Sequence, residues 1–380
     1  MKGLYHGKMA VMFNQRIKDL RQKLLEEKLD GVLISSVANI TYLTGYSNFF
    51  KEERDSYILI TKDGNYILTH SIYSKSLENK IPGFKIVEIS RREPPEKAIK
   101  NILKKNDAEI GIEEHDLKVY EYKKLLSVFK NLKNFDLKVR RSIKDKDEIR
   151  LITKACQMGD EVFEKVLKKI KLGMTEKQLV FEIENLINKR GFDLSFRTIV
   201  AFGANASAPH HQSGQTKLTN NQFVLMDFGV NYKNYCSDMT RTIFFGSPSR
   251  SRRKIYEVVL KAQKRAVDFI NSCLKSGKEI KASMVDKAAR DYITFRGYPT
   301  IPHSLGHGIG LQVHEHPLLS SKSKDILRKG MVFSIEPGIY LPAGRHGIPE
   351  FGGVRIEDLF VLEKDGLRQL TNSPKEMLIV

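Results

Sequence analysis

Carboxylates and histidines gather in the second half of this 380-residue sequence, within segments that are otherwise apolar. Asp227 lies in FVLMDFG and Glu336 lies in VFSIEPG. An ionised carboxylate inside an apolar strand is costly unless it is paired or bound to a metal. The histidines beyond residue 209 are His210, His211, His303, His307, His314, His316 and His346. Together these residues indicate a carboxylate-rich metal site.

Two further acids extend the site. Asp238 follows Asp227 beyond a turn predicted at 231–234, so two antiparallel strands joined there would bring both carboxylates to one face. Glu357 lies in GVRIED, another apolar segment. Oxygen and imidazole ligands without a thiolate favour Mn²⁺, Fe²⁺ or Co²⁺, and also accept Zn²⁺. Four acids exceed what one divalent ion needs, whereas two ions about 3.5–4 Å apart balance their charge.

Each of these residues also has an ordinary structural interpretation when taken alone. A strand aspartate such as Asp227 or Asp238 is often a turn or capping residue. His307 lies in a glycine-rich loop, where a histidine is commonly hydrogen-bonded rather than a ligand. Glu357 is two residues from Arg355 and could form a simple ion pair with it. The combination of the residues, in this order, favours the metal site.

The elements that must position these side chains fall into two regions. In the first region the sequence predicts a helix over 14–29, strands at 31–36, 109–114 and 135–140, and a hairpin turning at 62–65. This pattern is typical of an α/β domain with a mixed sheet. We place the domain boundary near residue 145, which gives an N-terminal domain of residues 1–145 and a catalytic domain of residues 146–380.

The second region begins with helical spacing, and a capping box from Thr175 to Gln178 opens a further helix. Strands follow in FRTIVAFG, FVLMDFGVNY and DMTRTIFFG. Two helices are expected at roughly 251–274 and 284–296, and strand signals return from residue 301. Helices followed by many antiparallel strands favour an α+β catalytic domain.

Composition limits the class of protein. The net charge of +19 is divided almost equally between the first 146 residues and the rest, which favours a lysine-rich solvated surface over nucleic-acid binding. Three widely spaced cysteines favour reduced thiols in the cytoplasm. No run of eighteen apolar residues occurs, and the N-terminus does not read as a signal peptide. We therefore expect a cytoplasmic protein without a membrane partner.

At four motifs the sequence resembles the "pita-bread" metallopeptidases, which include methionine aminopeptidase, prolidase, aminopeptidase P and creatinase. The motifs are MDFGVNYKNYCSDMTRT, HSLGHGIGLQVHEHP, FSIEPGIY and GVRIEDLF. The resemblance covers roughly residues 147–380. NITYLTGYSN in the first region is similar to a segment of aminopeptidase P and prolidase, so the Xaa-Pro branch is the nearer match. The resemblance implies a pita-bread catalytic domain behind an α/β N-terminal domain.

The resemblance also implies a role for each site residue. Two divalent ions, Mn²⁺ foremost, would be held by Asp227, Asp238, His307, Glu336 and Glu357. Asp238 and Glu357 would bridge them. His210, His303 and His314 match histidines that contact the substrate, and Arg355 matches an arginine behind the site. We assign His210, His314 and Glu336 to catalysis and His303 and Arg355 to substrate binding; His211, His316 and His346 have no counterpart and are read as structural.

The implied reaction is metal-assisted hydrolysis of the bond before proline in a peptide with proline at its second position. His314 would stabilise the oxyanion and Glu336 would carry the proton. Some prolidases hold a dipeptide's carboxylate with an arginine where this chain has Leu318, which favours longer peptides; Arg345 is a candidate replacement. An Xaa-Pro dipeptidase, a non-catalytic binding module and a metal-free creatinase-like hydrolase are the alternatives. The resemblance also implies a homodimer.

Overall fold

The computed structural model of the chain describes residues 2–50, 53–78, 80–342 and 352–380. Contacts divide the chain into two compact units, Met1–Leu137 and Lys138–Val380. Arg345 and His346 lie outside the described residues. Among the described residues, no helix is both long enough and apolar enough to cross a membrane.

The first unit is a six-stranded mixed sheet with strand order β4-β3-β2-β1-β5-β6. Strands β1 and β2 are antiparallel, whereas β1 and β5 are parallel. The expected hairpin across residues 62–65 joins β2 to β3. The elements, in chain order, are α1 (Lys2–Glu26), β1 (Gly31–Ile34), α2 (Val37–Thr44), β2 (Ser56–Thr61), β3 (Asn65–Thr69), α3 (Ser71–Leu77), β4 (Lys85–Glu88), α4 (Pro95–Leu103), β5 (Glu109–Ile112), α5 (Val119–Val128) and β6 (Asn131–Asn134).

One expected strand of this region is wrong. Residues 135–140 alternate Phe135, Leu137 and Val139 with polar residues, but the chain pairs earlier, in β6, and Lys138 already begins a helix. Phe135 and Leu137 are buried, and Val139 is 72% exposed. The alternation therefore does not mark one face of a sheet. The strand that forms the edge instead, β6, is polar. Its pairing with β5 uses backbone groups only and makes no demand on its side chains.

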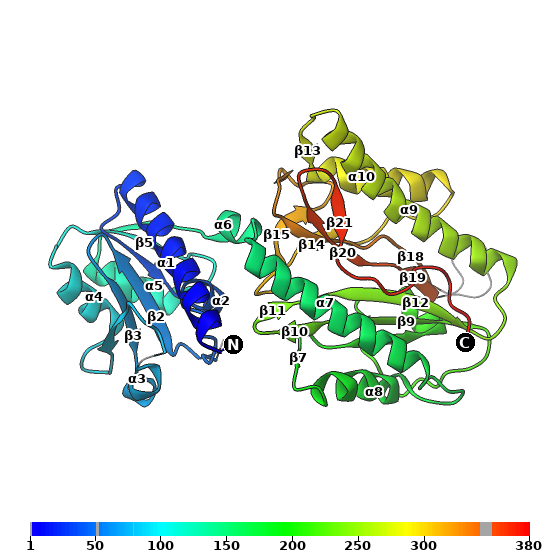
Figure 1. Cartoon of the computed structure of the whole chain (residues 1–380), viewed down its shortest axis with the longest axis horizontal. Coiled ribbons are helices and arrows are strands. Elements are labelled where there is room, and N and C mark those ends of the chain that lie inside the picture. Colours follow the sequence, from blue (N-terminus) through cyan, green and yellow to red (C-terminus); the bar gives the residue numbers. More distant parts are fainter. Residues whose placement is uncertain (1, 51–52, 79, 343–351) are drawn as a thin grey trace. The chain divides into compact units, whose positions relative to one another are not determined.

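The second unit contains two helix pairs on either side of antiparallel strands (Figure 1). Helices α7 and α8 pack with the three-stranded sheet β12-β9-β8, and α9 and α10 pack with strands of the five-stranded sheet β15-β14-β17-β20-β21. The elements up to α9 are α6 (Lys138–Ser142), α7 (Lys146–Leu167), α8 (Glu176–Asn188), β7 (Asp193–Leu194), β8 (Ile199–Phe202), η1 (Gly203–Ser207), β9 (Gln222–Phe228), β10 (Val230–Tyr232), β11 (Tyr235–Cys236), β12 (Met239–Phe245) and α9 (Arg250–Lys275).

The remaining elements complete the C-terminal half of this unit. They are β13 (Ile280–Lys281), α10 (Ala282–Phe295), β14 (Gly306–Gly308), β15 (Glu315–Leu319), β16 (Ile326–Leu327), β17 (Val332–Ile335), β18 (Gly338–Leu341), β19 (Gly352–Arg355), β20 (Asp358–Leu362) and β21 (Leu367–Gln369). The capping box predicted from Thr175 to Gln178 opens α8, and the two later helices match the expected positions closely. The α+β class with a mixed N-terminal sheet is confirmed.

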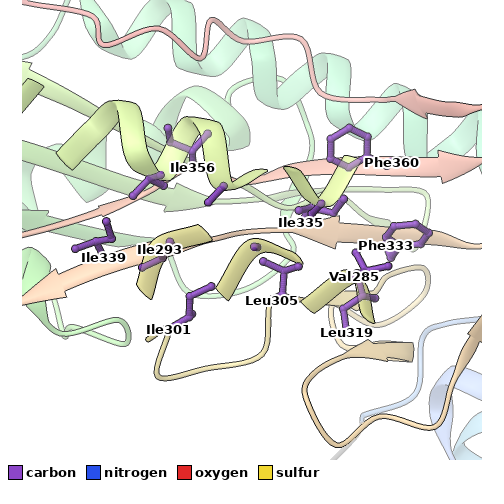
Figure 2. Packing of buried hydrophobic residues seen from close by; sticks show 14 of the residues in the cluster. Val285, Ile293, Ile301, Leu305, Leu319, Phe333, Ile335, Ile339, Ile356 and Phe360 are labelled. Carbon is purple, nitrogen blue, oxygen red and sulfur yellow. The ribbon is translucent and has the colours of Figure 1, made fainter. Parts of the chain in front are cut away.

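The largest core of this unit lies between α9, α10 and the strands that end at the site. Figure 2 shows Val285 of α10 beside Phe333 of β17, and Ile293 of α10 and Ile335 of β17 belong to the same cluster. All four side chains are fully buried. Close packing of this kind resists small displacements. The ends of these strands, which carry the polar residues of the site, therefore rest on a rigid core.

Candidate metal centre

A cavity of about 540 Å³ in the second unit gathers every site residue predicted from the sequence. Such a volume suits a small peptide. The predicted residues in its lining are His210, Asp227, Asp238, His303, His307, His314, Glu336, Arg355 and Glu357. They come from five separate stretches of chain that the fold brings together.

Asp227 and Asp238 are brought together by paired strands. Asp227 lies in β9 opposite Thr240 of β12, and Asp238 immediately precedes β12. Between them runs the β10–β11 hairpin, whose turn residues Lys233 and Asn234 have φ angles of 50° and 72°. Two residues with positive φ are typical of a type I′ hairpin turn. The expected antiparallel connection between the two aspartates is therefore confirmed.

His307 lies in β14 between Gly306 and Gly308, and other backbone segments approach both glycines closely. A Cβ on Gly306 would lie 2.0 Å from the carbonyl oxygen of Ser334. A Cβ on Gly308 would lie 2.1 Å from the carbonyl oxygen of His316. Only glycine permits such approaches, so the Gly-His-Gly sequence lets strands close around the histidine.

Three side chains form a compact ligand cluster. Ligand atoms of Asp238, His307 and Glu357 all lie within 4.8 Å of one another. Nε2 of His307 is 3.7 Å from Oδ2 of Asp238 and 3.5 Å from Oε1 of Glu336. Its Nδ1 lies 3.1 Å from the carbonyl oxygen of Gly308, so Nδ1–H donates and Nε2 keeps its lone pair. This arrangement is usual for a metal-binding histidine.

Buried carboxylate oxygens in the centre lack the hydrogen bonds that burial normally demands. Among the described residues, Oδ1 of Asp227, Oδ1 of Asp238 and Oε1 of Glu357 are buried and have no hydrogen-bond partner. An unsatisfied buried polar atom costs about 1–3 kcal/mol, and more when it is charged. Bound cations would satisfy all three oxygens, so the residues present fit a metal site.

The electrostatics of the cluster point the same way. Burial, and then the charge of Glu357, raises the pKa of both Asp238 and Glu336 well above the usual range. Burial, and then the charge of Asp227, raises the pKa of Glu357 to about 7. Carboxylates crowded in this way cannot all ionise unless positive charge is supplied. Bound metal ions would supply it.

Arg355 provides a fixed positive charge behind Asp227. Its Nη2 donates to Oδ2 of Asp227 at 2.5 Å and its Nε donates to Thr240 Oγ1 at 3.0 Å. Its Nη1 donates to the hydroxyl of Tyr340 at 3.1 Å. Tyr340 was not predicted from the sequence to be a site residue, although it ends the motif FSIEPGIY. Burial, the leading influence, raises the pKa of Tyr340 to about 12, so its hydroxyl keeps its proton.

Tyr340 in turn holds His303 in a neutral form. Nδ1 of His303 lies 2.7 Å from the carbonyl oxygen of Ser304, so Nδ1 carries a proton and donates it. Nε2 then accepts from the Tyr340 hydroxyl at 2.7 Å. Burial, and then the charge of Arg355, lowers the pKa of His303 to about 4. His303 therefore stays uncharged near neutral pH and shapes the wall of the cavity.

The two other predicted histidines differ in exposure. The ring of His314 packs edge-on against that of His307, with centroids 4.4 Å apart. Burial, and then nearby His210, lowers the pKa of His314. His210 is exposed and lies on the cavity wall, after the 3₁₀ turn η1. Both are placed where a bound substrate would reach them.

Two histidines expected to be structural make contacts of that kind. His211 Nε2 lies 2.9 Å from Oε2 of Glu176, a fully buried carboxylate on α8. His316 Nδ1 lies 3.2 Å from Oδ2 of Asp325, although His316 also borders the cavity. His211 thus anchors the loop that presents its neighbour His210.

A buried ion pair beside the cavity was not anticipated from the sequence. Glu315 is paired with Arg141 and lies 3.1 Å from Nζ of Lys144. Its Oε1 also accepts the backbone N–H of Gln312 at 3.0 Å. Glu315 therefore closes the loop that carries His314. The dipeptide His-Glu in HSLGHGIGLQVHEHP was the available signal, but its basic partners lie about 170 residues earlier in the chain.

Family models match nearly the whole chain. Residues 150–364 match metallopeptidase family M24, and residues 16–142 match the creatinase/prolidase N-terminal domain. The chain belongs to metallopeptidase family M24. This M24 peptidase is 36% identical over 373 residues to an uncharacterised peptidase of Staphylococcus aureus (strain bovine RF122 / ET3-1), covering 95% of this chain and 99% of the relative.

Solved structures also resemble the M24 peptidase. An Xaa-Pro dipeptidase from Bacillus anthracis is 32% identical, with a TM-score of 0.86, over 97% of this chain and 100% of that one. An X-Pro aminopeptidase from Thermotoga maritima MSB8 is 31% identical, with a TM-score of 0.82, over 96% and 99% of the two chains. The pita-bread fold and a metal-dependent peptidase activity follow from the family.

Proposed function

We propose that this M24 peptidase removes the N-terminal residue from peptides whose second residue is proline. The observation that carries the proposal is the convergence of three unpartnered buried carboxylate oxygens on the cluster of Asp238, His307 and Glu357. The named activities of the similar structures, an Xaa-Pro dipeptidase and an X-Pro aminopeptidase, support the choice of bond.

We assign two divalent ions, with Mn²⁺ preferred, to the centre. Asp238 and Glu357 would contact both ions, Asp227 would hold one, and His307 and Glu336 would hold the other. When bound, the ions supply Lewis acidity and make hydroxide available near neutral pH. Two ions fit the donor set because four carboxylates and one imidazole are more than one ion with open positions requires.

The remaining residues bind the substrate and move protons. Glu336 lies 3.4 Å from the Ser334 hydroxyl and lines the cavity, so its carboxylate suits carrying a proton to the leaving proline nitrogen. His314, on the cavity wall, is placed to donate a hydrogen bond to the oxyanion. His210 and His303 line the space where the proline ring would lie.

The length of the substrate is decided at the rim of the cavity. Leu318 lines the cavity and is 42% exposed, so an apolar group stands where a dipeptidase would profit from a cation. This favours peptides that continue beyond proline. A strict Xaa-Pro dipeptidase is the second candidate, because Lys138 and Arg141 of α6 line the same cavity and would attract a carboxylate.

Metal content measured together with hydrolysis tests the proposal. Protein is stripped with chelator and reloaded with Mn²⁺, and initial rates are compared for Ala-Pro, Ala-Pro-Ala and the control Ala-Ala-Ala. We expect two ions per chain, activity only after reloading, and faster cleavage of Ala-Pro-Ala than of Ala-Pro. Full activity of the stripped protein, or equal cleavage of Ala-Ala-Ala, would refute the proposal; exclusive cleavage of Ala-Pro would select the dipeptidase.

We also propose a homodimer that works in the cytoplasm. The resemblance to the Xaa-Pro peptidases supports the homodimer, and three free, buried cysteines support the cytoplasm. Light scattering coupled to size-exclusion chromatography gives the mass in solution, and twice 43.5 kDa is the expected result.

A further inference from the structure

The metal centre is assembled from two separate sheets. Asp227 lies in β9 and Asp238 immediately precedes its partner strand β12, whereas His307 lies in β14 and Glu336 immediately follows β17 of the five-stranded sheet. Glu357 immediately precedes β20 of that second sheet. The spacing between the two ligand groups therefore depends on whatever joins β12 to the start of β20.

Besides the backbone hydrogen bond from the N–H of Glu357 to the carbonyl oxygen of Thr240 at 3.1 Å, two consecutive side-chain cross-links make this join. On the site side, Thr240 Oγ1 donates to Oε2 of Glu357 at 2.8 Å. One residue further along each segment, Nη2 of Arg241 donates to Oδ1 of Asp358 at 2.6 Å. Successive side chains of an extended chain point to opposite faces, so the second cross-link lies behind the first.

The guanidinium of Arg241 also grips the backbone of both segments. Its Nη1 donates to the carbonyl oxygen of Thr240 at 3.0 Å and to that of Glu357 at 2.5 Å. The rigid, planar guanidinium thus fixes the backbone of Thr240, whose side chain contacts Glu357, and the backbone of Glu357, which is itself an assigned metal ligand. A shift of either strand would break several of these bonds at once.

Asp358 is equally constrained. Its Oδ1 accepts from Thr371 Oγ1 at 2.7 Å, and its Oδ2 accepts from Gln263 Nε2 at 3.0 Å. The side chains of Arg241 and Asp358 are 1% and 0% exposed. A buried ion pair adds little net stability compared with well-packed apolar side chains, so stability alone does not explain why this pair is present.

We propose that Arg241 and Asp358 are a positioning pair that sets the separation of the two ligand groups and thereby the affinity for metal. The proposal rests on the metal centre assigned above. It adds residues that contact neither substrate nor metal, and it includes the C-terminal segment, because Arg241 also donates to the carbonyl oxygens of Ser373 and Pro374.

The test uses full-length protein in three versions. The double variant R241M/D358A removes both charges together without enlarging either side chain, so no uncompensated buried charge is left behind. The control K375M removes a partly exposed amine that lies 3.3 Å from Oδ2 of Asp358. Metal-free proteins are titrated with Mn²⁺ in a calorimeter, and thermal melting in chelator verifies that each variant is folded.

We expect the double variant to stay folded and its Kd for Mn²⁺ to rise about 10–100-fold, as is usual when residues behind metal ligands are lost. The control should change less than twofold. A folded double variant with the wild-type Kd overturns the proposal. Failure of the wild type itself to bind Mn²⁺ is a different result, because it removes the metal centre on which the proposal rests.

A conservative variant covers the case in which the double variant does not fold. R241K keeps the charge beside Asp358, but it lacks the planar fork that reaches the carbonyl oxygens of Thr240 and Glu357. We expect R241K to remain folded with a lower melting temperature, because buried carbonyl oxygens lose their donor, and to bind Mn²⁺ more weakly by at least several-fold. Wild-type affinity in a folded R241K would contradict the positioning role.

Discussion

Arg355 holds one oxygen of Asp227 and leaves the other without a partner. Nη2 of Arg355 donates to Oδ2 at 2.5 Å, while Oδ1 is buried and lacks a hydrogen-bond partner among the described residues. The carboxylate is thereby fixed in orientation, with one oxygen committed to the protein. The other oxygen is in position to bind a cation.

Loss of Arg355 should therefore destabilise the protein more than loss of an exposed arginine. In R355M the buried carboxylate of Asp227 loses its counter-charge, and we expect a loss of about 3–5 kcal/mol in the free energy of unfolding. The measurement is urea unfolding in the presence of chelator. The control is R368M, which breaks the exposed pair with Glu363 and should cost under about 1 kcal/mol. Equal losses in the two variants would contradict the buried role of Arg355.

Substitution of Asp238 should affect the metal-free and metal-loaded proteins in opposite ways. D238N removes one of the crowded carboxylates whose mutual repulsion burdens the metal-free protein. We expect an unchanged or higher melting temperature in chelator, no rise on adding Mn²⁺, and no measurable peptidase activity. The wild type should gain several degrees with Mn²⁺, since a ligand that binds only the folded state stabilises it. A Mn²⁺-dependent rise in D238N would count against Asp238 as a ligand.

Metal affinity should increase with pH. The pKa of Glu357 is raised to about 7 in the folded protein, so its contribution to stability is fully present below pH 4.5 and is lost as pH rises through 7. Metal must displace the same proton. His307, whose pKa is lowered to about 4 chiefly by burial, stays neutral over this range. Calorimetry at pH 5, 6 and 7 in two buffers of different ionisation enthalpy should show rising affinity and proton release. A constant affinity would show that no proton is displaced.

A cation at position 318 should shift the preference toward dipeptides. L318R places a guanidinium on the cavity wall, where it can pair with the carboxylate of Ala-Pro. We expect kcat/KM for Ala-Pro to rise about tenfold relative to Ala-Pro-Ala, in line with a charge-assisted hydrogen bond worth about 1.5 kcal/mol. L318Q is the uncharged control. An identical ratio in L318R and L318Q would show that this wall does not contact the far end of the substrate.

The glycine after His307 should not tolerate alanine. In G308A the new methyl group would lie 2.1 Å from the carbonyl oxygen of His316, so β14 and β15 must separate. We expect lower stability and weaker metal binding. G159A is a matched control on α7, where the nearest atom is 3.8 Å away and alanine should stabilise by up to about 1 kcal/mol. Thermal melting of both variants, with and without Mn²⁺, decides the matter.

The sequence predicted the site residues because their surroundings are unusual. Asp227 and Glu336 interrupt apolar strands, and the turn signals after Asp227 correctly joined two antiparallel strands. The α+β class followed from the order of helical and strand signals, and the family followed from four motifs. That their ligand atoms converge on one cavity was not derivable from spacing, because His307 and Glu357 are brought together by long-range strand pairing.

The residues missed from the sequence share a different property. Tyr340, Arg141 and Lys144 act through partners distant in the chain. Tyr340 stands in the motif FSIEPGIY, but nothing in the local sequence of Arg141 and Lys144 separates them from ordinary surface residues. The wrong strand at 135–140 has a related cause. Burial of Phe135 and Leu137 imitates alternation, although the segment leaves the sheet and enters α6.

The close backbone approaches at Gly306, Gly308 and Gly353 have a consequence for engineering this peptidase. At each of them a carbonyl oxygen lies 2.0–2.1 Å from where a Cβ would stand. Substitutions at these three glycines would therefore be lost from a directed-evolution library, whatever activity is selected. Leu318 lies on the same cavity with a side chain that is 42% exposed, so a library aimed at new substrates is better directed to this position.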